Sequence, residues 1–333
     1  MSDLTIFSGS AHRDLAGSIA RLLNVPLGKS TTERFPDGEI SVCLGEPVRG
    51  CEVFIVQPTS PPVNDHLVEL LAMIDACRRS AAQRITAVLP YFGYSRSDKR
   101  HGRREPITAS MVALLLQAVG VDHILSIDLH AAQIEGFFHT AVDTLTAVPV
   151  LSDALRCRIP PGAVVVSPDE GRIKMASLYA QNLAVPLVII HKQRESGRET
   201  RVLRVVGEVR DRPCAIIDDM ISTGGTVSRS IAALLQAGAR PEIYVVATHA
   251  LFLPGARQKL SHHSVRAILV TDTIPVEAWP GLSVISIAPL IAGAIKRLAA
   301  KHAEGDLFDE APGNRAYIRL HPLFVLLLRL AKT

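Results

Sequence analysis

The sequence has few cysteines, no long apolar run and no strong excess of charge of one sign. Its five cysteines are scattered and contain no CxxC pair, which argues against a disulfide framework and a structural zinc site. No apolar run reaches the roughly 18 residues of a membrane span, and the start, MSDLTIFSGS, lacks the features of a signal peptide. These absences predict a soluble, cytoplasmic protein.

The charge and the length of the chain limit which classes of protein remain. The chain has 36 basic and 32 acidic residues, and a net charge of +4 is too balanced to predict nucleic-acid binding. Its 333 residues leave room for two domains, each with its own core. A break near residues 144–160 separates two sets of strands and helices of similar size. We therefore predict domains at residues 1–147 and 148–300, followed by a divergent tail at residues 301–333.

Short β-branched runs recur along the chain and alternate with helical patterns. The helical pattern at residues 66–82 places Leu67, Leu70, Ile74 and Cys77 on one face. The predicted strands lie at residues 4–9, 52–57, 85–92, 123–130, 163–169, 186–190, 214–219, 243–249, 266–272 and 282–287. This alternation predicts an α/β fold with parallel sheets, whose ligands bind beyond the carboxyl ends of strands.

The segment IIDDMISTGGT, residues 216–226, predicts a strand-to-helix turn that binds a phosphorylated sugar. Glycines let the backbone approach a ligand, and hydroxyls beside the free N–H groups of a helix start suit a phosphate. Asp218 and Asp219 would repel that phosphate, so we expect them to face sugar hydroxyls or magnesium-bound water. An ordinary loop with an Asp cap explains one acid and one glycine only. The lysine of a Walker A loop is absent.

A basic segment, PYFGYSRSDKRHGRREPIT at residues 90–108, follows another predicted strand. Taken alone, it is most simply a solvated loop. Its position after a strand also suits a polyanion such as a nucleoside triphosphate.

These segments, with RFPDGEI (34–40), SIDLHAAQIEGFF (126–138), VVVSPDEG (164–171) and IIHKQR (189–194), resemble in order those of the ribose-phosphate pyrophosphokinase family, also called PRPP synthetases. The resemblance extends over about residues 4 to 300. It implies two similar type I phosphoribosyltransferase-like domains, each a mainly parallel sheet flanked by helices. It also implies transfer of the diphosphoryl group of ATP to the C1 hydroxyl of ribose 5-phosphate, giving PRPP and AMP.

The resemblance assigns roles to individual residues. For catalysis it implies Lys192 and Arg194, in an extended segment where alternate side chains share one face. For ATP it implies Phe35, Asp37, Glu39, Arg96 and Ser97. For ribose 5-phosphate it implies Arg194, Asp218, Asp219, Ser222, Thr223, Gly224, Gly225 and Thr226. For Mg²⁺ it implies His130 and Asp169, with Asp169, phosphates and water dominating because this hard ion prefers oxygen.

In this family the loop at residues 34–40 reaches a neighbouring subunit, which implies a homo-oligomer, with a hexamer built from dimers as the expected form. A catalytically silent subunit that assembles with active synthetases is the alternative function, although Lys192, Arg194, His130 and Asp169 are all present. A phosphoribosyltransferase that consumes PRPP would need only one of the two domains. We expect neither a nucleic acid nor a membrane span among the partners.

Overall fold

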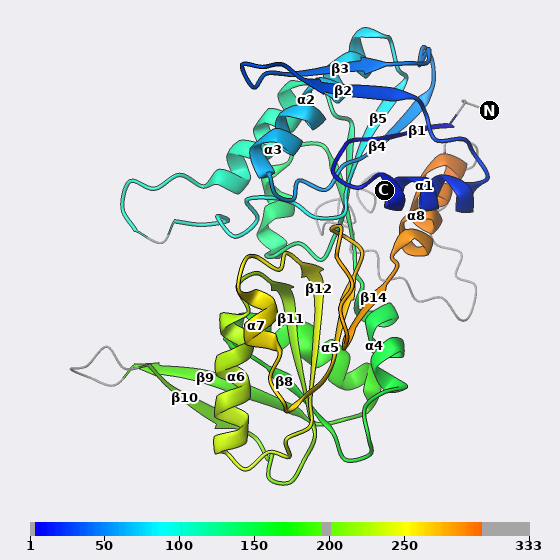
Figure 1. Cartoon of the computed structure of the whole chain (residues 1–333). Helices are drawn as coiled ribbons and strands as arrows, with labels where there is room; N and C mark the ends of the chain where they lie inside the picture. The colour runs from blue at the N-terminus through cyan, green and yellow to red at the C-terminus, as the bar shows by residue number, and fades with distance from the viewer. Residues whose placement is uncertain (1–3, 101, 195–200, 302–333) are drawn as a thin grey trace, which may run out of the picture. The chain divides into compact units, whose positions relative to one another are not determined.

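The computed structural model describes residues 4–100, 102–194 and 201–301. They form two compact units, the first from residues up to Thr146 with Thr273–Pro275 and the segment from Ala288, the second from Ala147–Asp272 and Val276–Ile287 (Figure 1). The first unit gives way to the second after Thr146, within one residue of the boundary predicted at 147.

Unit 1 is built on a five-stranded parallel sheet in the order β1-β4-β5-β6-β7. A separate antiparallel hairpin, β2–β3, lies between β1 and β4 in the chain. Its elements are β1 Leu4–Ser8, α1 Arg13–Leu23, β2 Ser30–Arg34, β3 Ile40–Leu44, β4 Glu52–Val56, α2 Val63–Arg79, β5 Arg84–Leu89, α3 Thr108–Ala118, β6 His123–Ile127, the 3-10 helix η1 Ala132–Phe137, β7 Ala141–Leu145 and α8 Ala288–Lys301.

Buried apolar side chains explain why these segments form strands and a covering helix. Every residue of β4 and β6 is buried, which fits near-continuous β-branched runs in a sheet covered on both faces. Leu70, Met73 and Ile74 of α2 are fully buried and belong to the same apolar cluster. The helical pattern predicted at residues 66–82 is therefore confirmed, shifted by three residues to Val63–Arg79.

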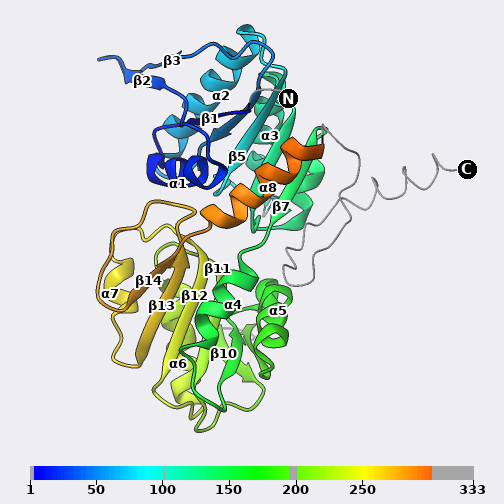
Figure 2. The same cartoon turned by 90° about the vertical axis from the view of Figure 1, so that its right-hand side faces the viewer.

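Helix α8 belongs to unit 1, although it follows the last strand of unit 2 in the chain. It packs against α1, and the two helices lie side by side in both views (Figures 1 and 2). Residues 288–300 were predicted to belong to the second domain. The structure corrects this, because α8 packs against α1 and so belongs to unit 1.

Unit 2 contains a seven-stranded sheet in the order β10-β9-β8-β11-β12-β13-β14. All neighbouring strands are parallel except β9 and β10, which form an antiparallel hairpin. Its elements are α4 Val148–Arg156, β8 Val164–Ser167, the 3-10 helix η2 Glu170–Arg172, α5 Ile173–Leu183, β9 Leu187–Arg194, β10 Arg201–Val206, β11 Cys214–Ile221, α6 Gly225–Gln236, β12 Ile243–Ala250, α7 Ala256–Leu260, β13 Val265–Thr271 and β14 Leu282–Ile285.

Candidate active site

The most distinctive feature of unit 2 is the turn between β11 and α6. Strand β11 is buried along its whole length and pairs with β8 on one side and β12 on the other. The turn after it leads directly into α6 at Gly225. The strand-to-helix turn predicted for residues 216–226 is thereby confirmed, at the carboxyl edge of the sheet.

Backbone geometry shapes this turn for close approach by a ligand. Gly224 caps α6 with φ +70°, a left-handed conformation that side chains disfavour, and a Cβ there would lie 3.2 Å from the carbonyl oxygen of Ala256. The carbonyl of Ser222 accepts a 3.0 Å hydrogen bond from the N–H of Leu253, which ties the turn to the segment after β12. Within the part of the chain that the structure describes, no side chain caps α6. The N–H groups of its first turn can therefore bind an anion.

Two buried acids lie in the second half of strand β11. Asp218 is 9% exposed and Asp219 only 2% exposed, and the N–H of Asp219 donates a 2.9 Å hydrogen bond to Oδ1 of Asp218. Burial raises the pKa of Asp218 well above its ordinary value, the charge of Asp219 and a hydrogen bond between the side chains raise it further, and Arg172 lowers it. A buried acid pair of this kind is typical of a site that binds hydroxyl groups or a cation.

Arg172 is the residue of this site that the sequence analysis missed. Its Nη1 lies 3.3 Å from Oδ2 of Asp219 and its Nε 3.8 Å from Oδ1 of Asp218. It ends the 3-10 helix η2 after β8, the strand beside β11, and its side chain is largely buried. Because its partners are far away in the sequence, only the strand pairing could reveal the contact.

Asp169 lies at the same edge of the sheet. It lies two residues after the end of β8, immediately before η2, and the hydroxyl of Ser167 donates a 2.7 Å hydrogen bond to its carbonyl oxygen. Next to it, Glu170 forms an ion pair with His191 of β9. Among the residues described, no three His, Cys, Asp or Glu side chains gather closely enough to hold a metal ion by themselves.

The segment predicted to carry the catalytic pair is strand β9, with Lys192 and Arg194 near its end. It forms a hairpin with β10 in which residue 192 pairs with Leu203 and residue 194 with Arg201. The extended backbone that the prediction required is present. The side chains of Lys192 and Arg194, and residues 195–200, lie outside what the structure describes.

In unit 1, the predicted adenine loop forms the tip of the β2–β3 hairpin. Its turn is closed by hydrogen bonds from Phe35 N–H to the Glu39 carbonyl (2.8 Å) and from Gly38 N–H to the Phe35 carbonyl (2.8 Å). Asp37 Oδ1 accepts a 3.1 Å bond from Glu39 N–H. Phe35 is 47% exposed, which is unusual for a large apolar ring and suits stacking on a partner.

The basic segment after β5 begins with Arg96, which is exposed, and Ser97, which is not. The Ser97 hydroxyl accepts a 3.2 Å hydrogen bond from Thr108 N–H and donates to Thr108 Oγ1 at 3.2 Å. Ser97 therefore stabilises the start of α3 through Thr108. This is a structural contact, and the predicted role of Ser97 in ATP binding stays a prediction. His130 lies after β6 in the same unit, at the carboxyl end of its strand.

Two family models match this chain. The N-terminal domain of ribose phosphate pyrophosphokinase matches residues 4–120, and the phosphoribosyl synthetase-associated domain matches residues 194–309. A ribose-phosphate pyrophosphokinase of Rhodopirellula baltica is 46% identical over 93% of this chain and 100% of its own. One from Brucella melitensis is 43% identical over 92% and 100%. The chain belongs to the ribose-phosphate pyrophosphokinase family.

The family assignment also fixes the fold class. The crystal structure of phosphoribosylpyrophosphate synthetase from Mycobacterium smegmatis matches 90% of this chain and 100% of its own length, with 41% identity and a TM-score of 0.85. The predicted fold of two phosphoribosyltransferase-like domains is confirmed. The predicted enzyme class is confirmed as well and is favoured over a silent subunit, since the relatives carry the name of the enzyme.

Among the described residues, no helix is long and apolar enough to cross a membrane. The predicted tail lies almost wholly outside the described part, which ends at residue 301.

Proposed function

We propose that this chain transfers the β,γ-diphosphoryl group of ATP to the C1 hydroxyl of ribose 5-phosphate, giving PRPP and AMP. The observation that carries the proposal is the β11–α6 turn, where a buried acid pair stands beside an uncapped helix start. A phosphorylated sugar matches both halves of this turn. Its phosphate suits the helix N-terminus, and its hydroxyls can donate to carboxylates.

For ribose 5-phosphate, we assign the 5-phosphate to the turn after β11, and the ribose hydroxyls to Asp218 and Asp219. Arg172, which contacts both acids, lowers the pKa of Asp218 and so opposes the rise that burial causes, which favours a carboxylate able to accept hydrogen bonds. The phosphate-binding residues are Ser222, Thr223, Gly224, Gly225 and Thr226.

For ATP, we assign the adenine to the tip of the β2–β3 hairpin and the phosphates to the basic segment after β5. The exposed ring of Phe35 supports stacking on a base, and Asp37 and Glu39 can accept hydrogen bonds from its amino group. Exposed Arg96 suits a phosphate, and Ser97 positions the same segment through its bonds to Thr108.

In the reaction, the C1 oxygen attacks the β-phosphorus, and the bond from this phosphorus to the oxygen of the α-phosphate breaks, releasing AMP. Negative charge accumulates on the nonbridging oxygens, so catalysis depends on positioning and on cations held nearby. We assign this role to Lys192 and Arg194. His130 and Asp169 would hold Mg²⁺, which supplies further positive charge to the phosphates when bound.

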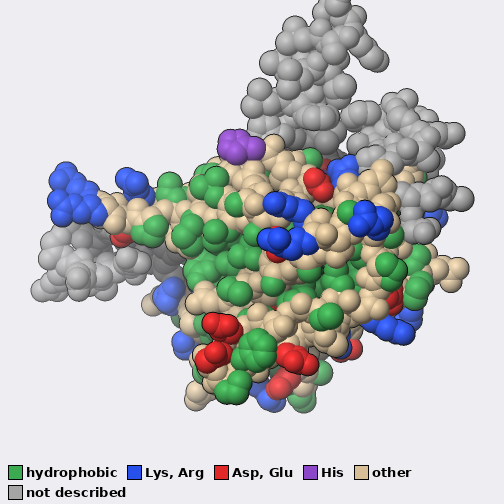
Figure 3. Space-filling view, turned by 90° about the horizontal axis from the view of Figure 1, so that it is seen from above, with side chains coloured by type: hydrophobic (Ala, Val, Ile, Leu, Met, Phe, Trp, Pro, Cys, Tyr) green, Lys and Arg blue, Asp and Glu red, His purple; other side chains and the backbone are tan. Residues whose placement is uncertain are grey.

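We propose that the active form is a homo-oligomer in the cytoplasm, with a hexamer built from dimers as the expected order. Helix α3 of unit 1 supports self-association, because Met111, Leu114 and Leu115 on it are 47%, 53% and 40% exposed. Hydrophobic side chains also gather over a broad area of the face drawn in Figure 3. Patches of this kind on a water-facing surface are typical of protein interfaces.

The test is an assay of purified protein with ATP, Mg²⁺ and ribose 5-phosphate that measures AMP and PRPP separately. We expect the two products in equal amounts. For the turn, Asp219→Asn should raise the KM for ribose 5-phosphate by about tenfold, since it removes a charged acceptor. Asp153→Asn, an exposed acid on α4, is the matched control. A folded oligomer that forms neither product would contradict the proposal.

A further inference from the structure

Glu69 of α2 is a buried acid on an apolar helix face. It is 1% exposed, and its neighbours Leu70, Met73 and Ile74 are fully buried. A carboxylate in such surroundings is strongly unfavourable unless hydrogen-bond donors surround it. No role in the proposed reaction requires an acid here, so its partners indicate what it does.

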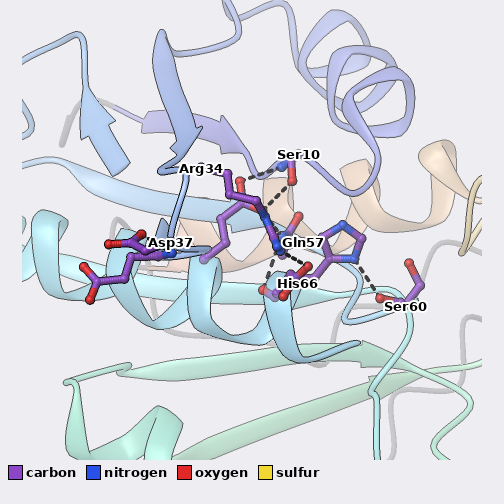
Figure 4. A network of polar contacts seen from close by, with 9 residues as sticks. Ser10, Arg34, Asp37, Gln57, Ser60 and His66 are labelled. Carbon is purple, nitrogen blue, oxygen red and sulfur yellow. Dashed lines mark hydrogen bonds and ion pairs between the residues drawn. The ribbon is translucent and has the colours of Figure 1, made fainter. Parts of the chain in front are cut away.

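Four donors converge on this carboxylate. Oε1 accepts from Ser10 N–H at 2.8 Å and from Thr32 Oγ1 at 2.7 Å. Oε2 accepts from Ser10 Oγ at 2.5 Å and from Gln57 Nε2 at 2.7 Å. The donors come from three segments, namely the loop after β1, strand β2 and the loop after β4. Glu69 is thus a hub that joins them, and Figure 4 shows Ser10 and Gln57 within the network.

The orientation of Gln57 is fixed by its other contacts. Its Oε1 accepts a 3.1 Å hydrogen bond from Ala11 N–H, and its Nε2 also approaches the carbonyl of His66 at 3.3 Å. A Cβ on Gly9 would lie 2.1 Å from Gln57 Oε1, so only glycine fits beside it. Because Oε1 already accepts from a backbone N–H, the amide nitrogen must point at Glu69.

Thr32 is the partner that connects this hub to the hairpin. It lies on β2, three residues before Phe35, and its residue pair on β3 is Val42. A second contact joins the same strand to α2, an exposed ion pair between Arg34 and Asp65. Exposed ion pairs contribute little, whereas a partly buried hydrogen bond to a carboxylate such as the one from Thr32 contributes more. The Thr32 bond is therefore the stronger local restraint on the stem of the adenine loop.

We propose that Glu69 is a positioning residue for nucleotide binding, which fixes the β2–β3 hairpin to the loops after β1 and β4. This inference rests on the proposed function, because it takes residues 35–39 as the adenine loop. A hairpin held in one orientation loses less conformational freedom when ATP binds. Loosening it should weaken ATP binding and leave ribose 5-phosphate binding unchanged.

The main test is Thr32→Val, which keeps the side-chain shape and removes the hydroxyl donor. We expect the KM for ATP to rise about three- to tenfold, as loss of one buried hydrogen bond implies, with unchanged kcat and KM for ribose 5-phosphate. Thr31→Val is the control, since Thr31 is exposed on the same strand. Equal ATP KM values in the two variants would overturn the inference.

A charge exchange tests Glu69 itself. Glu69→Gln replaces one carboxylate oxygen by an amide NH₂ group, which cannot accept hydrogen bonds from the donors that face Glu69. It should therefore raise the KM for ATP more than Thr32→Val does. In the double variant with Gln57→Glu, the amide of residue 69 can donate to the carboxylate of residue 57, which restores this hydrogen bond in the reverse direction. The double variant should therefore recover most of the lost affinity for ATP. A double variant no better than Glu69→Gln would contradict the hub arrangement.

A readout without activity separates this inference from the proposed function. Amide hydrogen exchange of residues 33–40 should become faster in Thr32→Val than in Thr31→Val, whatever the enzyme does. If wild-type protein forms no PRPP but exchange responds in this way, the proposed function fails and the restraint on the hairpin stands. If PRPP forms and neither exchange nor the KM for ATP responds, only the inference fails.

Discussion

The two units share one arrangement of strands but use it differently. Unit 1 has the order β1-β4-β5-β6-β7, and unit 2 contains β8-β11-β12-β13-β14 in the corresponding places. In both, a hairpin follows the first strand and helix of the sheet, β2–β3 in unit 1 and β9–β10 in unit 2. This correspondence indicates that the halves are structural repeats.

The hairpins show the first difference. The β2–β3 hairpin forms a sheet of its own and packs on α2, whereas β9 joins the main sheet beside β8. The proposed roles follow this difference. The β2–β3 hairpin lies outside the main sheet, so it can extend the proposed adenine loop away from the unit. The β9–β10 hairpin is part of the main sheet, so β9 ends at the same edge as β8 and β11.

The loops after the central strands show the second difference. Strand β4 leads to Gln57, whose side chain is held by Glu69 from the following helix. Strand β11, its counterpart, contains Asp218 and Asp219 near its carboxyl end. One repeat fills this position with hydrogen bonds to a buried Glu, and the other fills it with an acid pair that contacts Arg172. A shared fold therefore leaves room for different side-chain chemistry in the two repeats.

The largest expected effect on activity tests the role proposed for the β9–β10 hairpin of unit 2, through Lys192 near the end of β9. Lys192→Ala should lower kcat by about 10³-fold with unchanged assembly, because a cation that stabilises charge in the transition state is removed. Steady-state kinetics and size-exclusion chromatography would measure this. Arg204→Ala, an exposed cation on the paired strand β10, is the control. Near wild-type turnover in Lys192→Ala would remove this residue from the mechanism.

A smaller effect is expected in the open turn of unit 2. Gly224→Ala forces a side chain into a left-handed backbone beside the Ala256 carbonyl, which should destabilise the protein by about 1 kcal/mol. It should also raise the KM for ribose 5-phosphate by about tenfold, since it narrows the approach to the helix start. Gly238→Ala, at the other end of α6 with φ +86°, should cost similar stability without changing KM. Equal KM values would show that the turn does not bind the sugar phosphate.

The sequence predicted much of this framework because its signals are local. Each β-branched run became a strand, and the β11–α6 turn was found from its acids and glycines. The strands β2, β3, β7 and β10 were missed because they are short and lie at edges or in hairpins, and β2, STTER, is also polar. Tertiary packing alone decides that α8 returns to unit 1. Arg172 and Glu69 could not be found for the same reason, since their partners lie on other strands and loops.

The smallest effect concerns stability and compares the two buried acids directly. Glu69 has four donors, whereas Asp218 faces a second acid, and burial raises its pKa well above the ordinary value of 3.8. An acid whose folded pKa is raised contributes stability below its ordinary pKa and loses it as pH rises through the folded value. The ionised form of Asp218 therefore costs folding stability, and this cost grows as the pH rises through the raised pKa.

Asp218→Asn should accordingly raise the melting temperature at pH 7.5 by about 2–5 °C, and by less at pH 4, because the cost of ionising Asp218 falls as the pH is lowered. Glu69→Gln should lower it at both values, because an amide cannot accept from all four donors. Differential scanning calorimetry without substrate measures both, with the exposed Asp153→Asn as control. An Asp218→Asn protein less stable than wild type at pH 7.5 would mean that the carboxylate of Asp218 stabilises the fold through its contact with Arg172. The contrast between Glu69, which four donors stabilise, and Asp218, which costs stability, would then fail.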